Sequence, residues 1–420
     1  MTIDKPDQLA SLVGKTVFLY PVYNDPTQHP SQTQIIAVVV VELDTKRTHS
    51  ISFCHPDGLY QSPHNFGFLA SSVVYAYDCT ALKYCGFDVS NFIDSKAQYY
   101  LYSNQACNFE TPEVVAHYSK IYPQCTAIGS IVSLHKHEEI AKELSQKVVI
   151  RDIQPGLSFY QTTLLPAIHW VESSGLKTVD GFVHTQYNPY TTTGRPSNRF
   201  AGVNYAALSK TDGSRDRFVS RFGSDGVLVE IDFNAYHPRL IASLVGYEFT
   251  RESAYQQLAT ELFGINPSSA QVEKTKEDTF RQIYGGVQEH LLQTPFFKAA
   301  DQLSQLLWME FNKQDYLESP LSGRRLHSRF FTKMTRSMLF NYFIQMYETE
   351  TNMLMLIRLY NQFTNIEAKP ILYTYDSVLF DVPIGELDKL RTILAEQINL
   401  AQFPIKIKRG CNYGSMATLS

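Results

Sequence analysis

Short apolar runs separated by polar turns characterise the first 145 residues. The longest run, IIAVVVV at 35–41, has the length and the β-branched residues of a buried strand. A turn-rich stretch, THSISFCHPDGLY, follows it and predicts a partner strand in a hairpin. Helices are expected near residues 78–85 and 138–149. This pattern favours an α/β unit at the start of the chain.

The pattern changes after residue 186. Residues 187–225 are rich in Asn, Thr, Ser, Arg and Gly and are too polar for a core. A strand, GVLVEIDF, comes next, and helical stretches occupy most of residues 251–360. The chain then ends with one helix and the strand-like segments ILYTYD, VLFDV and FPIKIKR. Long helices inserted among these strands predict a multidomain fold of mixed α+β and α/β type.

Composition narrows the class of protein. With 420 residues, of which 44% are apolar and 19% charged, the chain is expected to form two or three folded domains. The net charge of −4 excludes a polycation, so a nucleic-acid contact would need a local basic face. No apolar run is long enough to cross a bilayer, no signal segment follows Met1, and the six cysteines lack metal-binding spacing. We therefore expect a cytoplasmic protein with reduced thiols and no membrane partner.

Two aspartates stand out at predicted strand ends. Asp232 ends the strand VLVEIDF, and Asp376 lies in LYTYDSVLFDV at a predicted hairpin turn. Carboxylates at strand ends suit metal coordination, and two of them could hold a pair of Mg²⁺ ions for phosphoryl transfer. Taken alone, the two acids are more simply explained as a helix cap and a turn residue.

The segments around these acids change that interpretation, because eight motifs follow one another between residues 190 and 415. They are Thr-Gly-Arg195, Asp232 with Arg239 seven residues later, SAYQQLATELFGI, Lys276-x3-Phe280-x3-Tyr284-Gly, Gly-Arg324-Arg325, Asn341-x3-Gln345, TYDSVLFDV with Asp376, and Gly410-Cys-Asn-Tyr413. In this order the motifs resemble those of the family A (polymerase I-like) DNA polymerases.

The resemblance implies a fold and a domain order. It implies a right-hand polymerase with palm, fingers and a reduced thumb, preceded by a ribonuclease H-like domain of 3′–5′ exonuclease type. The exonuclease-like domain would occupy residues 1–145, the thumb or connector 146–190, and the palm and fingers 191–420, with the fingers near 250–320. Because so short a thumb implies a weak grip on DNA, we expect low processivity or help from a processivity factor or other replication protein. Such a compact enzyme is expected to be of phage type and to act in the host cytoplasm.

The resemblance also implies a role for each motif residue in a template-directed DNA polymerase that acts on primer-template DNA and dNTPs. Asp232, Asp376 and the backbone carbonyl of Phe233 would hold two Mg²⁺ ions, for which Mn²⁺ can substitute, and Lys276 would be the general acid for the leaving pyrophosphate. The nucleotide would be bound by Lys276, Phe280, Tyr284, His237 and Tyr236. The DNA would be bound by Arg195, Arg324, Arg325, Asn341, Gln345 and Tyr375.

Physical chemistry supports these roles. The spacing of four residues places Lys276, Phe280 and Tyr284 on one helix face, where the Lys can neutralise triphosphate charge and the Phe can stack on a base. Donors such as Asn341 and Gln345 can reach the acceptors that every base pair shows in the minor groove. For Arg324 and Arg325, surface salt bridges are an equal alternative to phosphate contacts.

Several positions depart from the family pattern. His237 replaces the Glu that crowds the sugar 2′ position, Ser377 replaces the acid after the second Asp, and Val272 replaces an Arg of the triphosphate site. The ring of His237 is bulky enough to exclude a 2′-hydroxyl, although neighbouring Tyr236 is an alternative gate. These departures leave two other functions open: a single-subunit RNA polymerase or primase-like enzyme, and a non-catalytic DNA-binding accessory.

The first domain carries an incomplete set of exonuclease acids. Asp78, in YDCTALKYCGFDV, matches a metal-ligand Asp of such exonucleases, but their Asp-x-Glu pair is inverted here as Glu42-Leu-Asp44. The final Tyr-x3-Asp motif has no counterpart in HYSKIYPQ or IGSIVSLHK. A two-metal site needs its full set of carboxylates. The prediction is a degenerate, inactive domain, with an unrelated α/β domain as the alternative.

Overall fold

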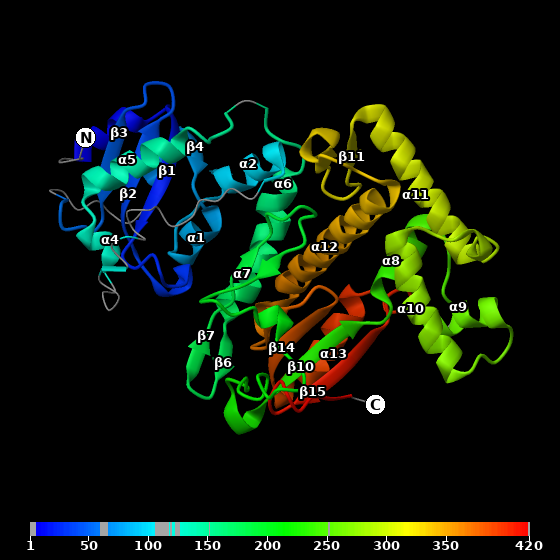
Figure 1. The fold of residues 1–420 in the computed structure, drawn as a ribbon. Helices are drawn as coiled ribbons and strands as arrows, with labels where there is room; N and C mark the ends of the chain where they lie inside the picture. The colour runs from blue at the N-terminus through cyan, green and yellow to red at the C-terminus, as the bar shows by residue number, and fades with distance from the viewer. Residues whose placement is uncertain are drawn as a thin grey trace. The chain divides into compact units, whose positions relative to one another are not determined.

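The computed structural model of the chain divides into a smaller unit, Met1–Gln161, and a larger unit, Thr162–Ser420 (Figure 1). The residues that the structure describes are 6–58, 66–105, 117, 120–121, 127–150, 152–250 and 253–418. Residues 118–119 and 122–124, in the segment HYSKIYPQ, lie outside this set. In the described part of the chain, no helix is both long and apolar enough to span a membrane.

A five-stranded sheet of order β3-β2-β1-β4-β5 forms the smaller unit. Its strands are β1 (Thr16–Tyr23), β2 (Ile35–Glu42), β3 (Thr48–Ser52), β4 (Val73–Ala76) and β5 (Ile93–Asp94). Strand β2 is antiparallel to both of its neighbours, whereas β4 is parallel to β1 and to β5. The hairpin of β2 and β3 confirms the predicted partner strand.

Apolar clusters cover both faces of this sheet, which explains why all eight residues of β2 are buried. Helix α5 covers one face through Leu134, Ile140 and Leu144, and helix α1 packs on the other through Leu82. The helices of this unit are α1 (Cys79–Tyr84), α2 (Ser95–Ser103), α4 (Ile128–Ile131), α5 (Leu134–Ser145) and α6 (Leu157–Phe159). A π-helical turn, Tyr160–Leu164, leads into the larger unit.

The larger unit contains an antiparallel sheet of order β13-β14-β10-β15-β16. Its strands are β10 (Gly226–Phe233), β13 (Lys369–Tyr373), β14 (Ser377–Pro383), β15 (Ile405–Gly410) and β16 (Ala417–Thr418). Three short hairpins accompany it: β6 (Leu176–Thr178) with β7 (Gly181–Val183), β8 (Tyr187–Asn188) with β9 (Ser197–Asn198), and β11 (Tyr316–Glu318) with β12 (Arg325–His327).

Helix α12 (Arg336–Gln362) organises the helical part of this unit, since it contacts α7, α8, α10, α11 and α13. The bounds of the other helices are α7 (Leu165–Ser174), α8 (Tyr236–Val245), α9 (Ala254–Phe263), α10 (Ser269–Gly285), α11 (Pro295–Gln314) and α13 (Leu387–Gln397). In Figure 1, α9, α10 and α11 gather on one side of α12. Ser268 and Gln271 form a capping box that starts α10, which places the predicted Lys-Phe-Tyr motif in one continuous helix.

Candidate active site

Two carboxylates lie side by side at one end of the larger sheet. Asp232 is the second-last residue of β10, and Asp376 lies in the turn between β13 and β14. Asp232 pairs with Ser377 across the sheet, and the N–H of Phe233 donates to the carbonyl of Asp376 at 2.9 Å. The two acids therefore occupy neighbouring strands at the same level of the sheet.

The surroundings of this pair disfavour negative charge. Burial raises the pKa of Asp232 above its ordinary value. Burial also raises the pKa of Asp376, and the charges of Asp232 and Glu348 add to that increase. Neither carboxylate forms an ion pair with a described residue. Two adjacent acids of this kind fit divalent cations, which would remove the repulsion between them.

The described residues include no group of three or more His, Cys, Asp or Glu side chains that could hold a metal ion. A cation at Asp232 and Asp376 would therefore take its other oxygen ligands from the Phe233 carbonyl, water or phosphate. This is the ligand set that Mg²⁺ prefers, because it keeps several waters and binds through one or two carboxylates.

The repulsion between the two acids leads to a stability prediction. A carboxylate whose pKa is raised in the folded state destabilises the fold above that pKa, and this cost disappears as the pH falls. At pH 7.5 without divalent cations, Asp376→Asn is expected to raise the melting temperature by about 2 °C, the shift that roughly 0.5–1 kcal/mol produces. Thermal unfolding followed by circular dichroism measures it. The exposed Asp388, in the first turn of α13, is the control, and Asp388→Asn should not raise the melting temperature. A fall for Asp376→Asn would contradict the prediction.

Asn352, on α12, holds the loops that follow β10 and β13. Its side-chain amide donates to the carbonyl of Tyr375 at 2.6 Å and to the hydroxyl of Tyr373 at 3.1 Å, and its carbonyl accepts from the hydroxyl of Tyr236. Tyr375 has a left-handed backbone with φ of 70°, which is uncommon for a residue other than glycine. The strained turn before Asp376 is thus secured by a neighbouring helix.

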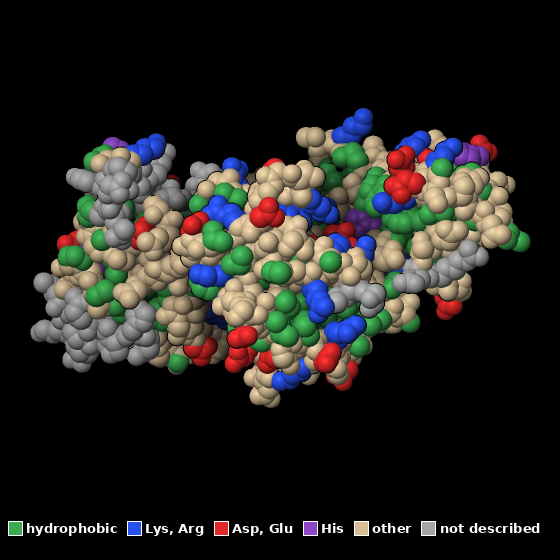
Figure 2. All heavy atoms as spheres, turned by 90° about the horizontal axis from the view of Figure 1, so that it is seen from below, with side chains coloured by type: hydrophobic (Ala, Val, Ile, Leu, Met, Phe, Trp, Pro, Cys, Tyr) green, Lys and Arg blue, Asp and Glu red, His purple; other side chains and the backbone are tan. Residues whose placement is uncertain are grey.

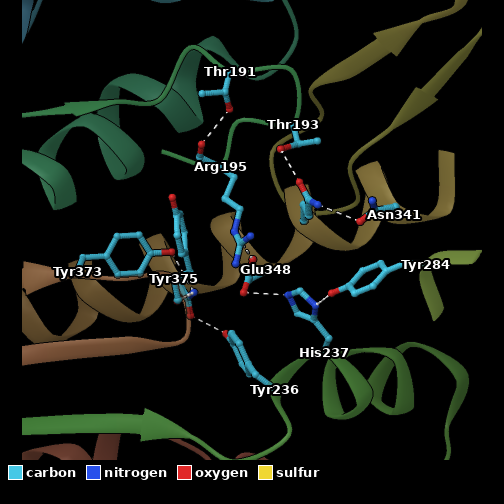
Figure 3. A network of polar contacts seen from close by, with 12 residues as sticks. Thr191, Thr193, Arg195, Tyr236, His237, Tyr284, Asn341, Glu348, Tyr373 and Tyr375 are labelled. Carbon is cyan, nitrogen blue, oxygen red and sulfur yellow. Dashed lines mark hydrogen bonds and ion pairs between the residues drawn. The ribbon is translucent and has the colours of Figure 1, made fainter. Parts of the chain in front are cut away.

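His237 lies between the candidate residue Tyr284 and the carboxylate of Glu348 (Figure 3). Its Nδ1 hydrogen-bonds with the hydroxyl of Tyr284, on α10, and its Nε2 lies 2.9 Å from the carboxylate of Glu348, on α12. Arg195 reaches the same carboxylate from the other side, with 3.1 Å between its Nε and Glu348 Oε2. Tyr236 points elsewhere, since its ring stacks on Phe233 with centroids 4.4 Å apart.

The three motif residues of α10 share one helix face but differ in exposure. The side chain of Lys276 is 49% exposed and pairs with Glu273 at 3.5 Å. Phe280 is exposed and stacks against the half-buried Tyr284, with ring centroids 6.1 Å apart. An exposed ion pair contributes little, so Lys276 can exchange Glu273 for another anion at small cost.

The predicted minor-groove residues form a polar chain at the start of α12. Thr193 donates to the side-chain carbonyl of Gln345 at 3.1 Å, and Gln345 donates to Asn341 at 2.9 Å. The guanidinium of Arg195 lies 3.8 Å from the centroid of the Tyr375 ring. Figure 2 shows a recess in which histidine, acidic and basic side chains meet.

The Arg-Arg motif separates into two environments. Arg324 is 1% exposed and donates to the carbonyl of Thr192 at 2.9 Å, so in this conformation it anchors the 191–195 loop and does not face solvent. Arg325 is partly exposed and pairs with Glu318 at 2.7 Å. A phosphate contact needs an accessible guanidinium, so Arg325 is the member of the pair that can reach DNA without a rearrangement. Arg324 was expected to contact DNA, but the loop of residues 191–195 covers it.

Comparisons with known proteins place this geometry in context. The sequence matches no protein-family model and no curated protein. Among solved structures, it is similar to the POL domain of Pol1 from M. smegmatis, solved in complex with DNA primer-template and dNTP. The similarity has a TM-score of 0.68 at 14% identity and covers 99% of this chain and 100% of that chain. The chain has a polymerase fold. The resemblance to family A polymerases is confirmed at the level of the fold.

In the smaller unit of this polymerase-like chain, the predicted acids do not come together. Glu42 ends β2 and lies opposite Val17, near the start of β1. Asp78 follows β4, which is parallel to β1, and so lies near the end of β1. Measured along β1, the positions opposite Glu42 and beside Asp78 are four residues apart, or about 13 Å. Asp44 is exposed in the turn after β2. The proposed grouping of Glu42, Asp44 and Asp78 was wrong because the sequence pattern does not reveal strand direction.

Basic side chains lie against two of these acids. Lys96 Nζ lies 2.6 Å from Asp78 Oδ2, and although burial lowers the pKa of Lys96, the charge of Asp78 raises it overall. Glu42 lies 2.8 Å from His49 Nε2 and accepts from Thr45. The ammonium group of Lys96 thus lies where a metal ion bound by Asp78 would have to lie.

Sequence reasoning missed Glu348 and Asn352. Both are buried polar residues of α12, with 1% exposure each. The signal was the polar run ETETN within an otherwise apolar helix, because polar residues persist inside a helix bundle only where they have partners.

Proposed function

We propose that the protein is a template-directed DNA polymerase that adds dNTPs to a primer 3′ end. The observation that carries this proposal is the pair of adjacent acids, Asp232 and Asp376, next to the motif face of α10. Burial raises the pKa of Tyr284, the charge of Glu348 raises it further, and the charge of Asp376 adds a smaller increase, which is consistent with α10 lying near the acids. The polymerase fold supports the same assignment.

The two acids would hold the metal ions. Asp232, Asp376 and the Phe233 carbonyl would bind two Mg²⁺ ions, or Mn²⁺ in their place. When bound, such ions activate the primer hydroxyl and stabilise the charge of the triphosphate and of the leaving pyrophosphate. The turn at Tyr375, held by Asn352, would keep Asp376 beside Asp232 before any substrate arrives.

The α10 face would bind the nucleotide. Lys276 would leave Glu273 for the triphosphate and give a proton to the leaving pyrophosphate. Phe280 would stack on the incoming base, and Tyr284 with His237 would form the wall beside the sugar.

The loop of residues 191–195 and the start of α12 would bind the primer-template. Arg195, Asn341 and Gln345 would donate to minor-groove acceptors that all base pairs share, which suits an enzyme that copies any sequence. Arg325 would contact phosphate, and Tyr375 would stack beside Arg195. A processivity factor, a phage origin and a cytoplasmic location stay predictions of the sequence.

Primer extension tests the function. The purified chain is incubated with a primed template, Mg²⁺ and either dNTPs or rNTPs, and the products are resolved on a denaturing gel. Template-directed extension with dNTPs is expected. Extension in the rNTP reaction but not in the dNTP reaction would favour the RNA polymerase or primase-like alternative, for which His237 and Ser377 are the supporting residues. DNA binding with no extension by either set would favour the accessory alternative.

The smaller unit we propose to be an inactive exonuclease-like domain. Its strand order, with β2 antiparallel and β4 and β5 parallel to β1, supports a ribonuclease H-like arrangement. The division into this domain, a reduced thumb over 146–190 and a palm with fingers over 191–420 is part of the proposal.

The exonuclease prediction has its own assay. An end-labelled single-stranded oligonucleotide, incubated with Mg²⁺ or Mn²⁺ and no dNTP, should keep its length. The reason is that Asp78 is paired with Lys96, and Glu42 and Asp44 lie too far from Asp78 to complete a two-metal site. Shortening that disappears in Asp78→Ala would show that the domain is active.

A further inference from the structure

Glu348 is a buried carboxylate that contacts two elements of the candidate site at once. It lies on α12, where 1% of its surface is exposed. One carboxylate oxygen is 2.9 Å from His237 Nε2, and the other is 3.1 Å from Arg195 Nε (Figure 3). The contact with Arg195 is an ion pair by distance, and neither contact is an aligned hydrogen bond.

Such a carboxylate is costly to bury, because it loses its hydration and its partners must compensate for that loss. A well-packed apolar side chain at this position would avoid the cost. The presence of Glu348 therefore calls for a role other than packing, and its position between His237 and Arg195 indicates where that role lies.

We propose that Glu348 is a positioning residue that fixes the ring of His237 and thereby sets the preference of the site for dNTP over rNTP. This inference rests on the proposed polymerase function.

The chemistry of the imidazole ring supports this role. A carboxylate beside Nε2 favours the proton on that nitrogen, which leaves Nδ1 of a neutral ring as an acceptor. Burial raises the pKa of Tyr284, and the charge of Glu348 raises it further, so its hydroxyl keeps a proton to donate to Nδ1. Both ring nitrogens are then engaged, one by α12 and one by α10, and the ring cannot turn aside to make room for a 2′-hydroxyl.

Arg195 completes the arrangement. Its guanidinium lies 3.1 Å from the buried carboxylate and offsets part of the cost of burying it, and Arg195 belongs to the loop proposed to contact the primer-template. Glu348 therefore links the DNA-binding loop to the residue beside the sugar, through one side chain.

The experiment compares single-nucleotide incorporation of dNTP and rNTP by the full chain. The quantity measured is the ratio of the two kcat/KM values. Glu348→Ala should lower this ratio about tenfold, which corresponds to about 1.4 kcal/mol. Glu348→Gln should keep the ratio within about threefold of wild type, because its amide can hold the ring in the opposite tautomer. If Glu348→Ala does not fold, Glu348→Met removes the carboxylate while it preserves the packing.

Two further variants separate positioning from general stability. Glu348→Ala in a His237→Ala background should add nothing to the effect of His237→Ala, since Glu348 acts through that ring. Glu350 is the matched control, because it lies on the same helix, is 2% exposed and accepts from Ser319 and Ser322. Glu350→Ala should lower the melting temperature and leave the ratio unchanged.

The proposal is overturned if Glu348→Ala leaves the ratio unchanged, if its effect adds to that of His237→Ala, or if Glu350→Ala lowers the ratio equally. It is also overturned if His237→Ala itself does not change the ratio. Absence of extension by the wild type with either nucleotide set would instead refute the proposed function.

Discussion

Replacing Asp232 or Asp376 with Asn is expected to lower primer extension about 10³-fold or more, which corresponds to about 4 kcal/mol of transition-state stabilisation. The reason is electrostatic, because an amide lacks the negative charge that would hold a cation. The described residues offer no cluster of other acids that could hold the cation instead. Folding should survive, because the two side chains repel each other and form no ion pair with a described residue. Single-turnover incorporation of one dNTP measures the loss.

Binding of the primer-template should change little in the same variants. Arg195, Asn341, Gln345 and Arg325 are left in place, and fluorescence anisotropy of a labelled duplex reports on them. Asp388→Asn, on the exposed face of α13, should extend primers as the wild type does. Extension within about tenfold of wild type by either active-site variant would refute the two-metal assignment.

Truncation of His237 to Ala has the second largest expected effect, a fall of roughly 10- to 100-fold in the preference for dNTP over rNTP. The ring is 9% exposed and lies against Tyr284, so its removal opens space beside the proposed sugar position. Steric exclusion needs bulk and not charge, which is why a histidine can act as the gate. The ratio of kcat/KM values for a matched dNTP and rNTP pair measures this effect.

Tyr236→Ala provides the comparison. Its ring stacks on Phe233 and its hydroxyl bonds to Asn352, so this truncation should lower the melting temperature and affect both nucleotides alike. A loss of discrimination in Tyr236→Ala alone would make Tyr236 the gate. No change in either variant would move the determinant elsewhere and favour the RNA polymerase alternative.

Local features of the site could be predicted from the sequence. A carboxylate after an apolar strand, as at Asp232, and a four-residue spacing, as from Lys276 to Tyr284, depend only on the periodicity of one element. The partners of those elements could not be predicted. Glu348 and Asn352 belong to a helix more than 100 residues from His237 and Tyr236 along the chain, and no local pattern encodes that pairing.

The same limit explains the two places where the structure differs from expectation. An apolar run identifies β2 as a strand but not its direction, so Glu42 was grouped with an acid at the opposite end of the sheet. A basic motif identifies Arg324 as charged but not as buried, because Thr192, in the loop that covers it, lies 132 residues earlier. The direction of a strand within its sheet, and the burial of a side chain by a segment far away in the sequence, depend on the tertiary structure.

The contacts of helix α12 determine where the chain of the larger unit can be interrupted without loss of the site. Within one and a half turns, Glu348, Glu350 and Asn352 hold the loop of Arg195, the β11–β12 hairpin through Ser319, and the turn before Asp376. A chain opened within these five residues would lose all three attachments together, whereas one opened in the exposed segment near residues 210–213 would lose none of them. Fragment complementation and circular permutation should therefore recover activity only from constructions that keep 348–352 continuous.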